Sequence, residues 1–246
     1  MSDIKLMAHM IAGYPDYEES LAVARALVRG GADYLEIQFP FSDPSADGPV
    51  IERASHVALA NGFRLADGFR LISTMAKETD VPIFIMTYAS LVFTGGIENF
   101  VRTAAEAGVS GLVIPDLPPD YDEGLYRAGK AAGVVITPVL SPAMTKERLE
   151  FIKKLKPEYV YTALRVGVTG KATDLDEATL AYLDDVSAIG AKIIAGFGVR
   201  TREQMRMLAG KAHASAVGSY FLEEMKNSGD PLKALEKACR GLKESA

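Results

Sequence analysis

The chain of 246 residues contains no tryptophan, one cysteine and three histidines. The lone Cys239 cannot form an intramolecular disulfide, which is typical of proteins from a reducing compartment. No apolar run approaches the ~18 residues of a membrane span, and the first residues lack a signal-peptide pattern. The net charge is −5 and the basic residues are scattered, so nothing favours binding to nucleic acid or anionic membrane. These absences predict a soluble, cytoplasmic, globular protein.

The sequence also lacks a recognisable metal-binding or nucleophilic motif. No group of His, Cys and Asp has the spacing of metal ligands, and no Ser–His–Asp set can be identified. The three histidines, His9, His56 and His213, lie far apart along the chain. We therefore expect no metal site, and we expect His9 to line a pocket or the core.

What the sequence does contain is a regular alternation of short apolar runs and amphipathic stretches. The apolar runs predict eight strands: Ile4–Ala12, Tyr34–Pro40, Pro82–Tyr88, Gly111–Asp116, Val134–Leu140, Tyr159–Leu164, Lys192–Phe197 and Ala214–Gly218. The amphipathic stretches predict helices: Tyr17–Arg29, Pro49–Ala60, Arg64–Thr79, Ile97–Ala107, Asp122–Ala132, Thr145–Leu155, Asp176–Ile189, Thr201–Ala209 and Pro231–Glu244. Thr145 and Thr201 are expected to cap helices, and Gly30 is expected to end one in a left-handed conformation.

Eight strand-then-helix units predict parallel strands with helices on the outer face. The strands are almost continuously apolar, as expected when both faces are buried. An open doubly wound sheet is the alternative, but eight units in about 240 residues favour a closed (β/α)8 TIM barrel. No linker or composition shift interrupts the chain, so we expect residues 1–246 to form a single domain. In such barrels the chemistry takes place at the C-terminal ends of the strands.

The second predicted strand carries an acid, Glu36, within an otherwise apolar run. An ionised carboxylate buried there is costly unless it is paired, so Glu36 is expected to be partly protonated or functional. A raised pKa suits a proton shuttle. The alternative is a glutamate that faces outward and pairs with a surface lysine, and the strand alone gives the two about equal weight. The loop that follows holds Asp43 and Asp47 beside turn-forming prolines and glycine, where each Asp alone is an ordinary turn residue.

Glycines at the ends of the seventh and eighth strands indicate an anion site. Gly196, Phe197 and Gly198 end one strand, and Gly218 and Ser219 end the next. Glycines let backbone N–H groups approach an anion closely, and Tyr220–Lys226 is long enough for a short helix that begins there. Phosphate binding by these two loops and a short extra helix is a recurrent use of the barrel. A third glycine-rich segment, Arg165–Gly170, is either a lid or a plain surface loop.

The segment Leu35–Pro49, LEIQFPFSDPSADGP, closely resembles the signature of the tryptophan synthase alpha subunit family. Shorter segments match that family in the same order: Ala12–Pro15, Tyr88–Val92, Pro115–Pro118, Gly167–Gly170, Gly196–Gly198 and Gly218–Ser219. The resemblance covers essentially the whole chain. It implies a lyase of tryptophan biosynthesis that cleaves indole-3-glycerol phosphate to indole and glyceraldehyde 3-phosphate.

The resemblance also implies roles for individual residues. Glu36 falls on the family's catalytic glutamate and Asp47 on its catalytic aspartate, while Tyr161 matches a tyrosine that orients the site. Glu36 would protonate indole C3 and then accept a proton from the side-chain hydroxyl, and Asp47 would accept the indole N–H. Thr169 matches a loop threonine that closes over Asp47. The phosphate would lie among Gly170, Gly196, Gly198, Gly218 and Ser219, and apolar residues such as Ile51, Val113 and Phe197 would line the indole pocket.

The family works with a beta subunit that carries pyridoxal phosphate, in an alpha2–beta2 assembly, and the alpha subunit itself needs no cofactor. Pro40 and Asp43 match positions in the loop that faces this partner. The alternatives are a free-standing lyase and a non-catalytic barrel that activates a beta subunit.

The chain also departs from the family pattern. It starts almost at its first strand, without the family's usual extra N-terminal helix. Gln38 replaces a glycine, His9 replaces an aromatic residue at the indole pocket, and Leu164 replaces a serine. Gln38 shares a strand face with Glu36, so both Gln38 and His9 are expected to reshape the pocket or tune Glu36.

Overall fold

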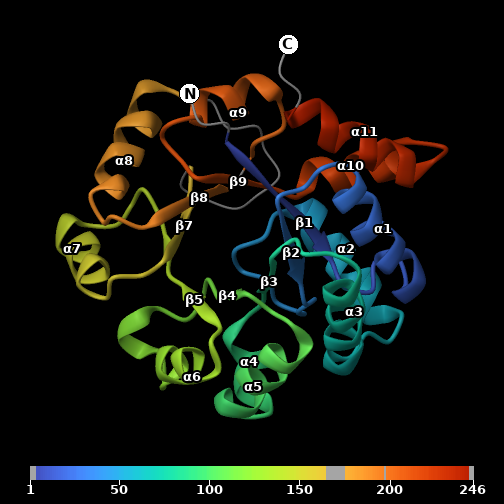
Figure 1. Cartoon of the computed structure of the whole chain (residues 1–246), viewed down its shortest axis with the longest axis horizontal. Coiled ribbons are helices and arrows are strands. Elements are labelled where there is room, and N and C mark those ends of the chain that lie inside the picture. The colour runs from blue at the N-terminus through green and yellow to red at the C-terminus, as the bar shows by residue number, and fades with distance from the viewer. Residues whose placement is uncertain (1–3, 165–174, 197, 244–246) are drawn as a thin grey trace.

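A computed structural model describes residues 4–164, 175–196 and 198–243. Within these residues, nine parallel strands form one sheet in the order β5-β4-β3-β2-β1-β9-β8-β7-β6. The strands are β1 (Lys5–Ile11), β2 (Tyr34–Gln38), β3 (Ile83–Met86), β4 (Gly111–Val113), β5 (Val135–Thr137), β6 (Val139–Leu140), β7 (Tyr159–Ala163), β8 (Lys192–Gly196) and β9 (Ala214–Val217). Helices surround the strands on the outside (Figure 1).

The two ends of this sheet order are parts of one chain segment, so the sheet curls into a nearly closed barrel. β5 and β6 are separated only by Pro138, which has no N–H to donate to a neighbouring strand. The Pro138 carbonyl still accepts a hydrogen bond from the Tyr161 backbone N–H at 2.9 Å. The predicted (β/α)8 barrel is therefore confirmed, and the single strand expected over Val134–Leu140 is two short strands because proline interrupts the ladder.

The observed helices follow the strands along the chain, and most lie within a few residues of the predicted ranges. They are α1 (Tyr17–Arg29), α2 (Pro49–Ala60), α3 (Leu65–Glu78), α4 (Ala89–Thr94), α5 (Ile97–Ala107), α6 (Leu125–Ala132), α7 (Lys146–Lys154), α8 (Glu177–Ser187), α9 (Arg202–Leu208), α10 (Ser219–Asn227), α11 (Pro231–Lys243) and the 3-10 turn η1 (Pro119–Tyr121). Helix α4 was not expected, because six residues are too few to show a helical repeat. Asp116 caps it from outside the segment, since Asp116 Oδ1 accepts the Ala89 N–H at 2.9 Å.

Side-chain caps begin two of the predicted helices as expected, whereas one predicted glycine cap is wrong. Thr145 and Thr201 each accept a backbone N–H in the first turn of α7 and α9. Gly30 has φ −70°, and the left-handed residue after α1 is Gly31, with φ +94°. Gly30 is required for space instead, because a Cβ there would lie 2.5 Å from the Cys239 Cβ of α11.

The barrel interior is filled by every second residue of the strands, in layers. Near the start of the strands, Tyr34, Phe84 and Tyr159 meet edge to face, with ring centroids 5.5–6.4 Å apart. The Tyr34 hydroxyl also lies 2.8 Å from His213 Nε2. Because side chains alternate along a strand, the interior residues above Tyr34 on β2 are Glu36 and then Gln38. The aromatic layer closes one end of the barrel, and the polar residues occupy the other.

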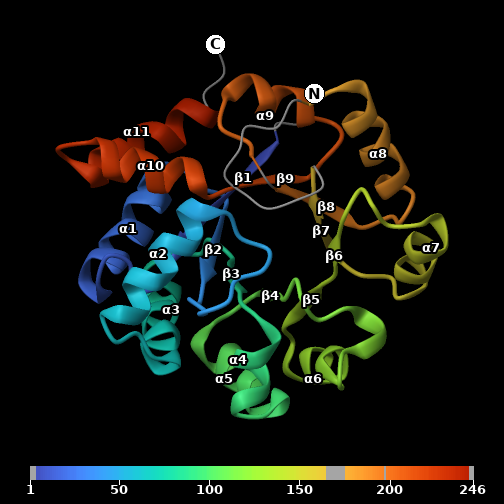
Figure 2. The same cartoon turned by 180° about the vertical axis from the view of Figure 1, so that it is seen from behind.

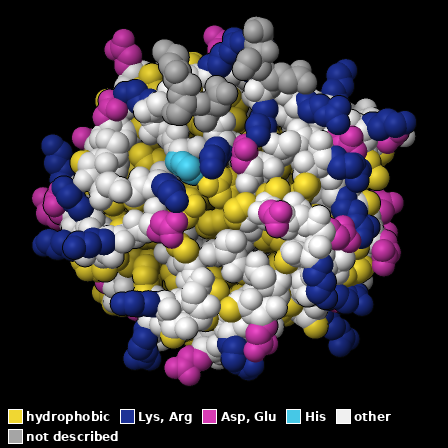
Figure 3. Space-filling view, viewed as in Figure 1, with side chains coloured by type: hydrophobic (Ala, Val, Ile, Leu, Met, Phe, Trp, Pro, Cys, Tyr) yellow, Lys and Arg dark blue, Asp and Glu magenta, His cyan; other side chains and the backbone are white. Residues whose placement is uncertain are grey.

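Charged side chains are dispersed over the face from which the strands start. On that face, acidic and basic side chains are interspersed around the edge, and apolar side chains gather toward the centre (Figure 3). The opposite face carries α2 and the loop that follows β2 (Figure 2). This second face is the one toward which the C-terminal ends of the strands point, and it holds the candidate site.

Candidate active site

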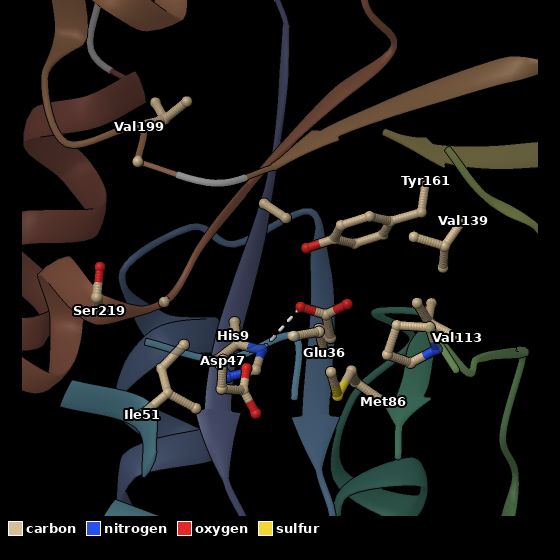
Figure 4. Close-up of a pocket in the computed structure, with 15 residues that line it drawn as sticks. His9, Glu36, Asp47, Ile51, Met86, Val113, Val139, Tyr161, Val199 and Ser219 are labelled. Carbon is tan, nitrogen blue, oxygen red and sulfur yellow. Dashed lines mark hydrogen bonds and ion pairs between the residues drawn. The ribbon is translucent and has the colours of Figure 1, made fainter. Parts of the chain in front are cut away.

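Glu36 lies inside the barrel and is paired with a histidine. It is 1% exposed, and its Oε2 atom lies 2.7 Å from Nδ1 of His9, which is 5% exposed. The two residues are direct partners in the β1–β2 register. Glu36 Oε1 is also buried and has no hydrogen bond to a described residue. The outward-facing alternative for Glu36 is therefore wrong, and the partner that makes its burial tolerable is an imidazole of the neighbouring strand, as Figure 4 shows.

Asp47 reaches the same space from the loop after β2. Its Oδ2 atom accepts hydrogen bonds from Gln38 Nε2 at 2.6 Å and from the Tyr88 hydroxyl at 3.0 Å. Burial raises the pKa of the Asp47 carboxyl, and the charge of His9 and the two hydrogen bonds oppose that rise. Asp47 is thus a buried carboxyl held in one orientation by two donors, which leaves Oδ1 available to a ligand.

Tyr88 also anchors the loop that carries Asp47. Its hydroxyl accepts the Ala46 N–H at 3.2 Å, and its ring stacks on Phe41 at 5.3 Å between centroids. The Asp47 N–H donates to the Pro44 carbonyl at 3.0 Å, which closes a turn. The turn chemistry of this loop therefore serves to present Asp47 to the barrel mouth.

Tyr161 faces the two acids from the opposite side of the barrel. It comes from β7, and its hydroxyl points toward Glu36 (Figure 4). The pKa of Tyr161 is raised well above its usual value, first by burial and then by the negative charges of Glu36 and Asp47. Gly196, on the adjacent strand β8, makes room for this ring, since a Cβ there would lie 2.7 Å from the Tyr161 hydroxyl oxygen. Tyr161 is therefore a neutral hydroxyl fixed beside the acids.

The expected anion end lies on the other side of the His9 ring from Glu36. Gly198, Gly218 and Ser219 all line the cavity, and Ser219 begins α10. Gly198 has φ +97°, a conformation that favours glycine. A Cβ on Gly218 would lie 2.6 Å from Cδ2 of His9, so the His9 ring packs directly against this backbone. The predicted residues Thr169, Gly170 and Phe197 lie outside the described residues.

The cavity itself has apolar walls between its polar ends. It encloses about 580 Å³ of space, part of it open to solvent. Apolar side chains from four strands, helix α2 and three connecting segments line it: Ala46, Ile51, Met86, Val113, Pro115, Val139, Val199 and Ala216. Ile51 and Val113 thus lie where an apolar ring pocket was expected. The arrangement suits a flat apolar ring held beside two carboxyl groups, with an anion at the glycine end.

Sequence reasoning missed two of the contacts that shape this site. Gln38 and Tyr88 both donate to Asp47, and only Gln38 gave a signal, because it lies two residues from Glu36 and shares its strand face. Leu164, another departure from the family pattern, is buried at the end of β7. His9 lines the cavity, as expected.

Among the described residues, no group of three or more His, Cys, Asp and Glu side chains is placed to hold a metal ion. No helix in the described part of the chain combines the length and apolar character needed to cross a membrane.

Comparison with known proteins identifies the family. The sequence profile of the tryptophan synthase alpha chain family matches residues 2–246. The chain belongs to the tryptophan synthase alpha chain family. The family's lyase activity, cleavage of indole-3-glycerol phosphate in tryptophan biosynthesis, is the activity that the sequence predicted.

Individual relatives agree with the family profile. The chain is 40% identical to the tryptophan synthase alpha chain of Helicobacter hepaticus over 225 residues, which cover 89% of this chain and 84% of that one. It superposes on a Mycobacterium tuberculosis tryptophan synthase structure with a TM-score of 0.90 and 30% identity, over 98% of this chain and 91% of that one. A tryptophan synthase complex from Pyrococcus furiosus matches with a TM-score of 0.88 and 28% identity, over 98% of each chain.

Proposed function

We propose that Glu36 is the acid–base catalyst of a retro-aldol cleavage in this chain. The observation that supports this role is its position: the carboxyl is buried at the cavity wall, and Asp47 and the glycine end line the same cavity. Cleavage requires a proton on indole C3 and removal of a proton from the hydroxyl of the adjacent side-chain carbon. One carboxyl group beside both atoms can perform the two transfers in turn.

Asp47 is proposed to accept a hydrogen bond from the indole N–H. Protonation at C3 places positive charge on the ring nitrogen, and a carboxylate beside that nitrogen stabilises it. Gln38 and Tyr88 fix the Asp47 carboxyl through Oδ2. Tyr161 is proposed to orient the reacting groups with its neutral hydroxyl, since ionisation next to two acids is unfavourable.

The substrate phosphate is proposed to bind at the glycine end. Gly198, Gly218 and Ser219 line this part of the cavity, and the N-terminus of the nine-residue helix α10 begins at Ser219. Helix N-termini offer free N–H groups and a favourable dipole to anions. Substrate binding is also proposed to involve four further residues: Thr169, Gly170, Gly196 and Phe197.

The partner is proposed to be a tryptophan synthase beta subunit in an alpha2–beta2 assembly. That subunit, and not this chain, is proposed to carry pyridoxal phosphate, and the assembly is proposed to be cytoplasmic. Asp43 is exposed in the loop after β2, where it could meet a partner, whereas Pro40 is buried and would act by shaping that loop.

The test is steady-state indole release from indole-3-glycerol phosphate, with and without a beta subunit. Glu36→Gln should lower kcat about 10²- to 10⁴-fold, because it removes the acid–base group and preserves the side-chain shape. Glu52→Gln is the control: Glu52 is exposed on α2, next to the cavity residue Ile51, and its substitution should leave turnover unchanged.

Three outcomes would contradict parts of this proposal. Wild-type turnover in Glu36→Gln would remove Glu36 from the mechanism. Indole release without any complex or mutual activation on adding a beta subunit would favour a free-standing lyase. A complex without indole release by this chain would favour a non-catalytic activating barrel.

A further inference from the structure

His9 is placed between the acid–base residue and the anion end of the cavity. Its Nδ1 atom is 2.7 Å from Glu36 Oε2, while the other edge of the ring packs against Gly218. Both side chains of the pair are almost fully buried. The imidazole therefore lies between the Glu36 carboxyl group and the Gly218 backbone.

The retro-aldol reaction requires a proton donor, and an isolated carboxylate has no proton to donate. Glu36 must first donate a proton to indole C3 and afterwards accept one from the substrate hydroxyl. In the arrangement with a proton on His9 Nδ1, Glu36 accepts this hydrogen bond as a carboxylate and holds no proton of its own to donate. A proton must therefore be stored within reach of Glu36, and His9 is the titratable group in contact with its Oε2 atom.

We propose that His9 is a positioning residue that holds the catalytic proton for Glu36. This inference rests on the proposed role of Glu36.

The proposed proton transfers begin from a resting pair in which His9 is doubly protonated and Glu36 is ionised. As Glu36 protonates indole C3, the Nδ1 proton moves to the carboxyl group, which leaves neutral His9, ionised Glu36 and a cationic ring. The carbon–carbon bond then breaks, and its electron pair neutralises the ring. The hydroxyl proton passes through Glu36 back to His9, which restores the pair and releases indole and the aldehyde.

The described titratable side chains around His9 in the cavity are acids and a phenol. The titratable groups that face it are Glu36 on β2, Asp47 on the following loop and Tyr161 on β7, and no described lysine or arginine lines the cavity. The charge of His9 is the strongest influence opposing the raised pKa of Asp47.

The second ring nitrogen of His9 has no partner among the described side chains. His9 Nε2 is buried and makes no hydrogen bond with a described residue. A substrate with its phosphate at Gly218 and its ring at Asp47 would extend its glycerol chain past His9.

The first test compares the pH dependence of kcat in wild-type protein, His9→Asn and His9→Phe, using indole release. Asn places an N–H donor where Nδ1 lies but cannot store a proton, whereas Phe keeps the ring shape and loses both functions. Both variants should lose about 10²-fold in kcat at neutral pH, with KM little changed. The alkaline limb of their kcat profiles should move to lower pH, because Glu36 must then carry the proton alone.

The comparison of the two variants distinguishes a His9 that stores a proton from a His9 that only holds Glu36 in place. Activity of His9→Asn should exceed that of His9→Phe and should recover on acidification, which loss of structure would not produce. His56→Asn is the control, because His56 is exposed on α2 and should leave the profile unchanged. A wild-type pH profile and turnover in both His9 variants would overturn the proposal.

The second test needs no activity, so it also distinguishes this inference from the proposed function. The chain has three histidines, and NMR of protein with ¹⁵N-labelled histidine reports the protonation of each ring. His9 should be doubly protonated in the wild type at neutral pH, and Glu36→Gln should make it lose its proton at lower pH. A singly protonated His9 in the wild type would refute the proposal even if Glu36 proves catalytic. Absence of indole release with an intact His9–Glu36 pair would instead refute the proposed function.

Discussion

At the level of single residues, the candidate active site contains two buried acids, each with its own specific partners. Glu36 receives an imidazole and Asp47 receives an amide and a phenol. These partners do not fully offset the free-energy cost of burying a charged carboxyl group, because burial still raises the pKa of Asp47. Burial of the Asp47 carboxyl group is therefore expected to lower the stability of the fold.

Asp47→Asn should therefore stabilise the protein while it lowers activity. The folded-state pKa of Asp47 is raised, so its favourable contribution to stability is complete below the unfolded pKa and is lost as pH rises through the folded pKa. The amide can still accept from Gln38 and Tyr88 but avoids the buried charge. We expect about 1 kcal/mol more unfolding free energy at neutral pH and a gain that shrinks on acidification.

The measurement is urea denaturation of wild type and variant at neutral and mildly acidic pH. Indole release should fall about 10²-fold in the same variant, because the charge that we propose to stabilise the cationic ring is lost. A variant less stable than wild type at neutral pH would show that burial of the charge is not the dominant cost.

At the level of secondary-structure elements, helices dock on the barrel at positions where glycine permits close approach. Gly68 in α3 faces Phe39, and a Cβ there would lie 2.5 Å from the ring. Gly241 in α11 is exposed, and a Cβ there would meet nothing within 4 Å. Glycine thus permits close packing in α3, whereas in α11 it has no packing role.

Alanine at these two positions should change stability in opposite directions. Gly68→Ala should lower the free energy of unfolding by about 1–3 kcal/mol, because the docked helix must shift away from Phe39. Gly241→Ala should raise it by about 0.5–1 kcal/mol, because alanine loses less conformational entropy in a helix. Chemical denaturation of both variants checks this pair, and a loss of stability in Gly241→Ala would contradict it.

At the level of the whole molecule, the C-terminal helix completes the fold beside the first strand. Helix α11 packs against α1, α10 and β1. Lys243 Nζ lies 2.8 Å from Asp33 Oδ2, and the same oxygen accepts the Leu6 N–H of β1 at 2.8 Å. Cys239, on the buried face of α11, is fully enclosed by this contact. Access to its thiol therefore reports whether α11 is docked.

Cys239 should resist thiol reagents in the native protein. Burial raises the pKa of its thiol to about 12, so little thiolate forms near neutral pH, and the sulfur is also shielded. Labelling should be at least about 10³-fold slower than in protein unfolded by guanidinium, since it requires undocking of α11. Lys243→Ala should speed labelling by loosening the helix. Native labelling as fast as in the unfolded chain would show that α11 is not held in place.

The architecture could be predicted because it depends on periodic patterns along the chain. Apolar strands, amphipathic helices and glycines at strand ends follow from local chemistry, and the eight-unit count favoured closure of the barrel. Predictions were wrong where a single residue changed the backbone, as at Pro138, and where a segment was capped from afar, as at Ala89.

The sequence by itself determined which residue types stand at the mouth of the barrel, and its family signature named the chemistry. Only the tertiary structure decided which of them meet. His9 and Glu36 are 27 residues apart in the sequence, and Tyr88 and Asp47 are 41 apart. Their contacts depend on strand register and on the alternation of side chains across the barrel wall. These are properties of the closed sheet, because burial and close approach arise only when distant segments pack together.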